Sequence, residues 1–270
     1  MSEQPALLVE RDGHVVTVTM NRPEARNALN PEMICRMADV WDMIDTDEDV
    51  RVAILTGSNG HFCAGADLDK LVSRSLKGLP PENDWEQRIR DDYQVIFRGL
   101  LRTSRTIKPL IAAIEGSCIA GGVEILQATD IRVAAPNASF ALTEATRGVM
   151  AVNGGTQRIL AQVPYAIGME MMLTGKAIDA ETALRHGFVN CIVPQEQLMA
   201  TAIDYARRIA EFPPLHLQAA KEMMLRSRDM NLADGMRMEQ FVSYLLSSTE
   251  DGKEGTKAFA EKRKPQYKGR

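Results

Sequence analysis

The first half of the chain alternates strand and helix patterns. Residues 14–20 read His-Val-Val-Thr-Val-Thr-Met, and their apolar and threonine side chains alternate with the period of two that is typical of a half-buried strand. Asn30-Pro31 has the form of a helix N-cap followed by proline, and apolar residues then recur at helical spacing to about residue 45. Three short apolar runs predict strands that are buried on both faces: 52–55, 110–114 and 131–134. Strand and helix patterns alternate to about residue 195, so we predict an α/β fold.

The pattern changes after residue 195. Helical periodicity extends over residues 196–211, 215–227 and 232–248, and no strand pattern appears in this region. In the last of these ranges Met238, Phe241, Val242 and Leu245 form one helical stripe. We therefore predict an α/β core over residues 1–195 and a helical C-terminal subdomain over residues 196–270, whose apolar face packs on the core or on a neighbouring subunit.

Residues 69–94 interrupt the core pattern. They are rich in charge and contain Gly78-Leu79-Pro80-Pro81. A segment this polar is typical of solvated surface or of a lid, so the sequence predicts a mobile loop.

Composition excludes several classes of protein. The 270 residues contain 32 Lys and Arg against 36 Asp and Glu, a net charge of −4, and we expect no nucleic-acid partner. No apolar run is long enough to span a membrane, and residues 1–5 lack the features of a signal peptide. The cysteines form no C-x-x-C pair and no zinc-ligand spacing with the histidines. We expect reduced, mostly buried thiols, no metal and a cytoplasmic location.

Two glycine-rich turns follow predicted buried strands, at residues 62–68 and 116–124. Small side chains leave backbone N–H groups unshielded, and a helix that begins near Gly121 points its positive end outward. Two such donors can hold a carbonyl oxygen as it becomes an oxyanion. The alternative is that these glycines and alanines serve only tight turns and close packing. Neither segment matches a nucleotide-phosphate motif.

Two carboxylates stand in apolar surroundings. Glu124 follows two glycines and precedes Ile-Leu, and Glu144 follows Phe-Ala-Leu-Thr. Across one pocket they would repel each other, which would raise one pKa into the range useful for acid–base catalysis. The alternative is an exposed loop glutamate and a first-turn glutamate at a helix N-terminus. Nucleophilic catalysis by Cys63 with His61 is disfavoured, and Ser117 lies in no G-x-S-x-G motif.

In these residues the sequence resembles the crotonase superfamily, the enoyl-CoA hydratase/isomerase family. The resemblance covers nearly the whole chain. It rests on these motifs, in order: Asn21-Arg22-Pro23 with Asn27-Ala28-Leu29-Asn30, Ala64-Gly65-Ala66-Asp67-Leu68, Lys108-Pro109 through Ile114, Ala120-Gly121-Gly122-Val123-Glu124, Gly154-Gly155-Thr156-Gln157-Arg158, Leu173-Thr174-Gly175, Gly187-Phe188-Val189 with Val193-Pro194, and Ala258-Phe259-Ala260-Glu261-Lys262-Arg263.

The resemblance implies a crotonase-like spiral of β-β-α turns with a helical C-terminal subdomain that takes part in assembly as a trimer or a dimer of trimers. It implies an oxyanion hole for an acyl-CoA thioester, made by the backbone N–H groups of Ala66 and Gly121. Glu124 and Glu144, 20 residues apart, match the two glutamates of the hydratases. The expected activity is therefore hydration of trans-2-enoyl-CoA in fatty-acid or related acyl-CoA β-oxidation. The alternatives are a double-bond isomerase, another enolate-forming acyl-CoA enzyme, or a non-catalytic acyl-CoA-binding protein.

The resemblance also assigns contacts with CoA. It implies that one set of residues lines the CoA path and that two more reach the CoA of a neighbouring subunit. The first set is Arg26, Ala28, Ala64, Asp67 and Leu68, and the second is Phe259 and Lys262. For Arg26 and Lys262 the alternative is plain solvated charge. CoA is part of the substrate, so the resemblance implies no separate cofactor and no metal.

One segment departs from the family pattern Gly-x-x-Pro-Gly-x-Gly-Gly-Thr. Residues 148–156 carry Ala151 and Val152 where the family has proline and glycine, in a segment that helps to line the water site. Arg147 lies three residues after Glu144. It either holds that carboxylate ionised or points to solvent or a CoA phosphate. The 69–94 segment is longer than in compact hydratases and is expected to border the acyl pocket, which leaves a larger or ring-bearing acyl group open.

Overall fold

The computed structural model describes residues 4–74, 77–103 and 105–270. Within these residues a six-stranded sheet has the order β1-β2-β3-β4-β6-β9 and a smaller sheet has the order β5-β7-β8. The strands of the large sheet are β1 (Leu7–Asp12), β2 (Val15–Met20), β3 (Val52–Gly57), β4 (Leu110–Ile114), β6 (Ile131–Ala134) and β9 (Cys191–Ile192). Those of the small sheet are β5 (Ser117–Ile119), β7 (Ser139–Ala141) and β8 (Ile178–Asp179). In the large sheet β1 and β2 pair antiparallel, and the other neighbours pair parallel.

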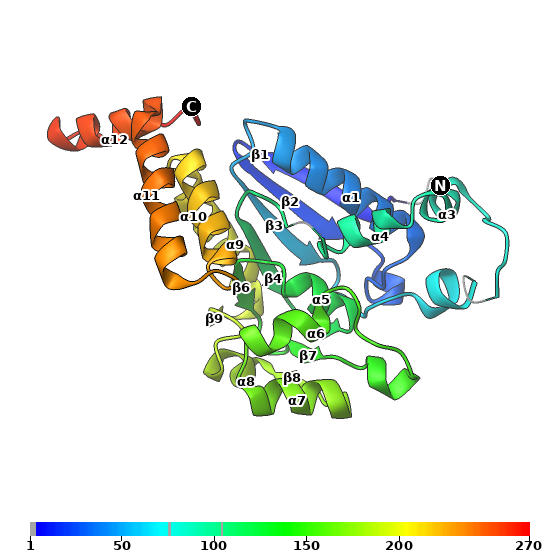
Figure 1. The fold of residues 1–270 in the computed structure, drawn as a ribbon. Coiled ribbons are helices and arrows are strands. Elements are labelled where there is room, and N and C mark those ends of the chain that lie inside the picture. Colours follow the sequence, from blue (N-terminus) through cyan, green and yellow to red (C-terminus); the bar gives the residue numbers. More distant parts are fainter. Residues whose placement is uncertain (1–3, 75–76, 104) are drawn as a thin grey trace.

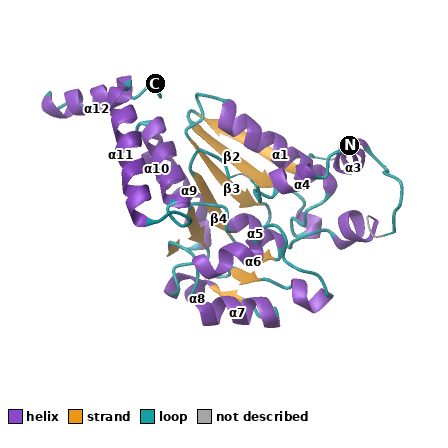
Figure 2. Ribbon diagram, in the orientation of Figure 1, coloured by secondary structure: helices purple, strands orange, loops and turns teal. Residues whose placement is uncertain are grey.

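Helices cover both faces of the large sheet (Figure 2). Helix α1 (Pro31–Thr46) begins as predicted, because the Asn30 side chain accepts a hydrogen bond of 2.9 Å from the Met33 N–H. Its apolar face packs in one core cluster with alternate strand residues such as Leu55. The intervening residues, such as Ile54, pack in a second cluster with helix α9 (Leu198–Ala210). The prediction that these strands are buried on both faces is confirmed.

The C-terminal region is helical, as predicted. Helices α10 (Pro214–Arg226) and α11 (Leu232–Ser248) match the predicted ranges, and α12 (Glu250–Ala260) is an additional helix that the periodicity did not reveal. Figure 1 shows α11 and α12 projecting away from the sheet. Several large apolar side chains of α11 are exposed: Met236, Met238, Phe241, Tyr244 and Leu245. Among the described residues, no helix is both long and apolar enough to cross a membrane.

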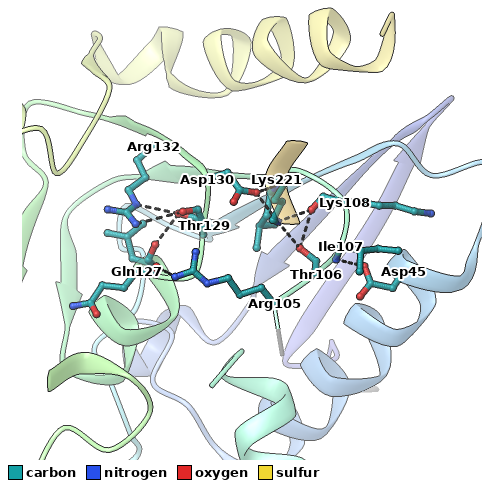
Figure 3. Close-up of polar contacts among 12 residues, drawn as sticks. Asp45, Arg105, Thr106, Ile107, Lys108, Gln127, Thr129, Asp130, Arg132 and Lys221 are labelled. Atoms are coloured by element: carbon teal, nitrogen blue, oxygen red, sulfur yellow. Dashed lines mark hydrogen bonds and ion pairs between the residues drawn. The ribbon is translucent and has the colours of Figure 1, made fainter. Parts of the chain in front are cut away.

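A polar cluster attaches α10 to the core (Figure 3). The ammonium of Lys221 lies 2.7 Å from the Asp130 carboxylate and donates to the Lys108 carbonyl at 2.9 Å. The Asp130 carboxylate also accepts from the Leu110 N–H at 2.8 Å, at the start of β4. These contacts attach α10 to the start of β4, the strand that precedes β5 in the chain.

The polar segment after Ala66 differs from the predicted loop. Residues Leu68–Ser73 form a short helical turn, and Asp84–Asp91 form helix α3, which Asn83 caps with a 3.0 Å hydrogen bond to the Glu86 N–H. Trp85 and Ile89 of α3 pack against the core, which explains the order of a segment with so many charges. Residues 75–76 of the predicted loop lie outside the described residues.

Candidate functional site

The two glycine-rich turns lie against each other. Leu29 bridges to Ala66, since the Leu29 N–H donates to the Gly65 carbonyl at 2.8 Å and the Asp67 N–H donates to the Leu29 carbonyl at 3.0 Å. Gly65 has a φ of +89°, and a Cβ on it would lie 2.9 Å from the Ala120 Cβ and 3.5 Å from the Gly121 nitrogen. Only glycine fits this position. The close approach therefore brings the Ala66 turn to the start of helix α5 (Gly121–Leu126).

The N–H groups of Ala66 and Gly121 have the properties of oxyanion donors. Gly121 is the first residue of α5, so its N–H has no acceptor within the helix. Among the described residues, neither N–H donates to a protein oxygen. Both residues line the same cavity of about 610 Å³. An oxygen that enters this cavity can therefore meet two backbone donors.

Glu124 and Glu144 line this cavity as well. Its wall also carries apolar side chains of the 69–94 segment, which was expected to border the acyl pocket: Leu71, Val72, Leu79, Ile89 and Tyr93. A mostly apolar wall with a few convergent polar groups is typical of a small-molecule site. Two carboxyl groups in one such cavity suit proton transfer rather than nucleophilic attack.

Glu124 lies in the first turn of α5 and is buried. Its Oε1 accepts hydrogen bonds from the Asn153 N–H at 2.6 Å and from the Gly155 N–H at 3.2 Å, and its Oε2 accepts from Asn153 Nδ2 at 3.3 Å. Burial raises the pKa of Glu124, and these donors oppose the rise. Glu124 is thus a first-turn glutamate at a helix N-terminus, as the alternative had it, but a buried one that lines the cavity.

Glu144 begins a 3-10 turn (Glu144–Arg147) and is buried too. Its Oε2 has no hydrogen-bond partner among the described residues. Burial, with a smaller contribution from the Glu124 charge, raises the pKa of Glu144 to about 7. A carboxyl group with this pKa carries its proton for much of the time at neutral pH and can donate it.

Arg147 does not pair with Glu144. Its guanidinium donates to Thr143 Oγ1 at 3.1 Å, and the side chain is exposed at the cavity wall. Arg147 therefore forms no ion pair with Glu144 in the described residues, although its charge partly opposes the rise in the pKa of Glu144.

The segment that departs from the family pattern forms the base of the site. Ala151 is buried, and a Cβ on Gly155 would lie 2.7 Å from the Ala151 Cβ and 3.0 Å from Glu124 Oε1. Asn153 contacts Glu124 directly, although sequence reasoning did not single it out. The sequence does contain a signal for this contact: the variable position of the family pattern, between Val152 and Gly154, carries an asparagine whose amide can donate a hydrogen bond.

The structure brings together the five residues predicted to line the CoA path within one chain. The Ala64 N–H donates to the Arg26 carbonyl at 3.0 Å. The guanidinium of Arg22, a residue that the sequence analysis did not assign, bonds the Ala28 carbonyl at 2.6 Å and the Asp67 carboxylate at 2.9 Å. Leu68 is half exposed beside them.

The two residues expected to reach a neighbouring subunit lie elsewhere. Phe259 is 86% exposed on α12, and Lys262 follows that helix. Figure 1 shows α12 far from α5, so neither residue contributes to the cavity of its own chain.

Cys63 is not among the residues that line this cavity. Burial raises the pKa of the Cys63 thiol to about 12, which makes it a poor nucleophile. Within the part of the chain that the structure describes, no three His, Cys, Asp or Glu side chains are grouped as metal ligands.

Comparisons with known proteins show the family and the fold of this chain. A profile of the enoyl-CoA hydratase/isomerase family matches residues 10–270. The chain is 39% identical to an enoyl-CoA hydratase of Mycobacterium tuberculosis, over 98% of this chain and 97% of that protein. It is 40% identical to the (E)-benzylidenesuccinyl-CoA hydratase of Thauera aromatica, over 97% and 98% of the two chains. The crystal structure of an enoyl-CoA hydratase from Mycobacterium marinum superposes with a TM-score of 0.87 at 35% identity and covers 99% of this chain and 100% of its own.

Proposed function

Because the chain belongs to the enoyl-CoA hydratase/isomerase family, we propose that it adds water across the double bond of a trans-2-enoyl-CoA thioester to give a 3-hydroxyacyl-CoA. One observation carries the proposal. A buried, hydrogen-bonded carboxylate (Glu124) and a buried carboxyl group without a partner (Glu144) line the cavity that also receives the Ala66 and Gly121 N–H groups. This is the donor and acid–base set that hydration through a thioester enolate needs.

The proposed reaction assigns one task to each group. The N–H groups of Ala66 and Gly121 bind the thioester oxygen and draw electrons from the double bond, so that C3 becomes electrophilic. Glu124 accepts a proton from the attacking water as its oxygen bonds to C3, and Glu144 delivers its proton to C2. The second hydrogen of the water stays on the new hydroxyl group. One water is consumed, and the two carboxyl groups exchange protonation states.

The proposal extends to binding and assembly. The turn of Arg26, Ala28, Ala64, Asp67 and Leu68 would hold the CoA moiety beside the cavity. The exposed apolar stripe of α11 would pack on neighbouring copies in a trimer or a dimer of trimers, which would bring Phe259 and Lys262 to the CoA of another subunit. We place the reaction in the breakdown of fatty-acid or related acyl-CoA esters in the cytoplasm.

The test is hydration of crotonyl-CoA and of longer 2-enoyl-CoA esters, followed by loss of the enoyl-thioester absorbance. We expect turnover by the wild type and a fall of about 10²–10⁴-fold in both Glu124→Gln and Glu144→Gln, because each removes a proton-transfer group. Glu181→Gln is the matched control, since Glu181 is exposed on helix α8 (Ala180–Arg185). Its activity should equal that of the wild type.

The assay also separates the alternatives. Binding of enoyl-CoA esters of every length without hydration would contradict the proposal and favour a non-catalytic binding protein. Conversion of 3-enoyl-CoA to 2-enoyl-CoA without hydration would favour an isomerase. The profile of rate against chain length, with ring-bearing esters included, defines the acyl group that the cavity accepts.

A further inference from the structure

Asn153 holds both oxygens of the Glu124 carboxylate. Its backbone N–H lies 2.6 Å from Oε1, and its side-chain Nδ2 lies 3.3 Å from Oε2. The Gly155 N–H supplies a third donor to Oε1 at 3.2 Å. The Oε1 contacts come from the backbone, whereas the Oε2 contact depends on the identity of residue 153. This makes the Asn153 amide the part of the arrangement that a substitution can remove.

The orientation of the Asn153 amide follows from its partner. An ionised carboxylate only accepts hydrogen bonds, so the NH₂ group must face Glu124 and the oxygen must face away. That oxygen, Oδ1, is buried and has no partner among the described residues. An unpaired buried acceptor is unfavourable. The fold tolerates this cost while the amide bonds the carboxylate, which points to a role in function rather than in stability.

Two other charged groups act on Glu124 within the site. Glu144, on the neighbouring 3-10 turn, carries a like charge when it is ionised. Arg158, at the end of helix α6 (Gly155–Arg158), favours the ionised form of Glu124, although its guanidinium bonds the Leu101 and Arg102 carbonyls. No direct ion pair between Arg158 and Glu124 occurs in the described residues, so direct hydrogen bonds are the main support of the carboxylate charge.

We propose that the Asn153 side chain is a positioning residue that orients the Glu124 carboxylate and keeps it ionised, so that Glu124 serves as the base while Glu144 keeps the proton that it delivers. The inference rests on the proposed hydratase reaction. In this proposal the Asn153 amide determines which of two chemically identical carboxyl groups acts as the base and which as the acid. Removal of the amide leaves both backbone donors in place, so the loop that carries them is retained.

The test compares Asn153→Ala and Asn153→Asp with the wild type. The alanine variant loses one donor to Oε2, and the aspartate variant puts a negative charge at the same place. The pKa of Glu124 should therefore rise in the order wild type, Asn153→Ala, Asn153→Asp. The pKa that defines the acid limb of the pH profile of kcat/KM for enoyl-CoA hydration should rise in the same order, by about one pH unit in Asn153→Ala. On the acid side of the profile, kcat/KM of this variant should therefore be about tenfold lower than that of the wild type.

Two further measurements make the outcome decisive. Carbon-13 NMR titration of the Glu124 carboxyl, assigned with Glu124→Gln, follows the same pKa order in the free protein and does not depend on turnover. Binding of butyryl-CoA, which cannot be hydrated, should change little, so that the loss appears in kcat rather than in affinity. Gln157→Ala is the matched amide deletion, because Gln157 is exposed on α6 and does not line the cavity.

Each result decides a different claim. If the pKa of Glu124 is the same in all three proteins, or if the rate falls equally at all pH values, the proposed role of Asn153 is wrong. Asn153 would then have only a structural role. A wild type that does not hydrate any ester would overturn the proposed function, while the titration would still test the effect of Asn153 on Glu124. The predicted order with active wild type supports both.

Discussion

Glu124 and Glu144 line one cavity, but the protein treats them differently: Glu124 accepts hydrogen bonds from Asn153 and Gly155, whereas Glu144 Oε2 has no partner in the described part of the chain. Burial raises the pKa of both groups, and Glu144 reaches about 7. Donors to a carboxylate stabilise its charge, so the asymmetry separates the two glutamates into a base and an acid. This separation has consequences for stability as well as for activity.

The first prediction concerns the stability cost of Glu144. Its pKa is raised from 4.5 in the unfolded chain to about 7 in the folded chain. The folded state therefore keeps a proton that the unfolded state releases between these values, and the free energy of unfolding falls as the pH rises through this range. Glu144→Gln removes this dependence. It should stabilise the fold at pH 8 by up to about 3 kcal/mol relative to wild type, with little effect at pH 4.

Urea denaturation of both proteins at the two pH values measures this difference. Glu181→Gln controls for loss of a surface charge. An equal effect of Glu144→Gln at pH 4 and pH 8 would mean that Glu144 titrates normally and is not the proton donor.

The second prediction concerns the space beneath Glu124. A Cβ at Gly155 would lie 3.0 Å from Glu124 Oε1 and 2.7 Å from the Ala151 Cβ, and both neighbours are buried. Gly155→Ala should therefore displace the carboxylate, with a loss of about 10²-fold in kcat and about 1–3 kcal/mol in stability. Gly235→Ala is the control, since a Cβ at Gly235 of α11 meets nothing within 4 Å. That variant should be fully active and equally or more stable, and equal effects of the two changes would contradict the packing argument.

The third prediction separates backbone strain from the geometry of the oxyanion site. Gly65 and Gly13 both have positive φ, but a Cβ at Gly65 would lie 2.9 Å from the Ala120 Cβ, and one at Gly13 meets nothing within 4 Å. Both alanine variants bear a strain of about 1–2 kcal/mol. Gly65→Ala should in addition push the Ala66 turn away from α5 and lower kcat by about 10²–10³-fold. Steady-state kinetics beside thermal unfolding distinguishes the two, and a similar loss of rate in Gly13→Ala would disprove the assignment.

Much of this site could be predicted from the sequence, because the relevant signals are local. The helix start at Asn30 depends on one cap, and the burial of β3 and β4 depends on short apolar runs. The family resemblance and the crotonase-like α/β fold are confirmed by the match over residues 10–270 and by the superposition with solved structures. The assignment of Ala66, Gly121, Glu124 and Glu144 to specific tasks stays a prediction until the variants are measured.

What the sequence did not reveal depends on contacts between distant segments. Helix α3 forms in a segment predicted as a loop because Trp85 and Ile89 pack against the core, and such packing leaves no local periodic signal in a segment so rich in charge. The role of Asn153 likewise requires a partner 29 residues earlier in the chain. Arg22 was noted only as part of a motif, although its guanidinium reaches Asp67, 45 residues later.

The last prediction concerns this Arg22–Asp67 pair, which links the segment before α1 to the turn that carries Ala66. The two side chains are only 9% and 14% exposed, and Nη1 lies 2.9 Å from Asp67 Oδ2. In the wild type, Asp67 Oδ1 accepts a hydrogen bond from the Lys70 N–H at 3.0 Å, and the asparagine of Asp67→Asn can still accept it. The substitution nevertheless leaves the Arg22 charge without its main partner. Breaking a buried pair typically costs about 3–5 kcal/mol. Because the exposed Glu24 carboxylate lies 3.7 Å from Arg22 Nε, we expect a smaller cost of about 2–3 kcal/mol.

A double-mutant cycle with Arg22→Met and Asp67→Asn isolates the pair from other effects of each change. Since the turn of Asp67 carries both the proposed CoA contacts and the Ala66 N–H, we expect Asp67→Asn to raise KM for the CoA ester and to lower kcat. The double variant should recover stability relative to the sum of the single variants, because neither buried charge remains. Additive stability losses, or an unchanged KM in Asp67→Asn, would show that the pair is not what holds this turn against α5.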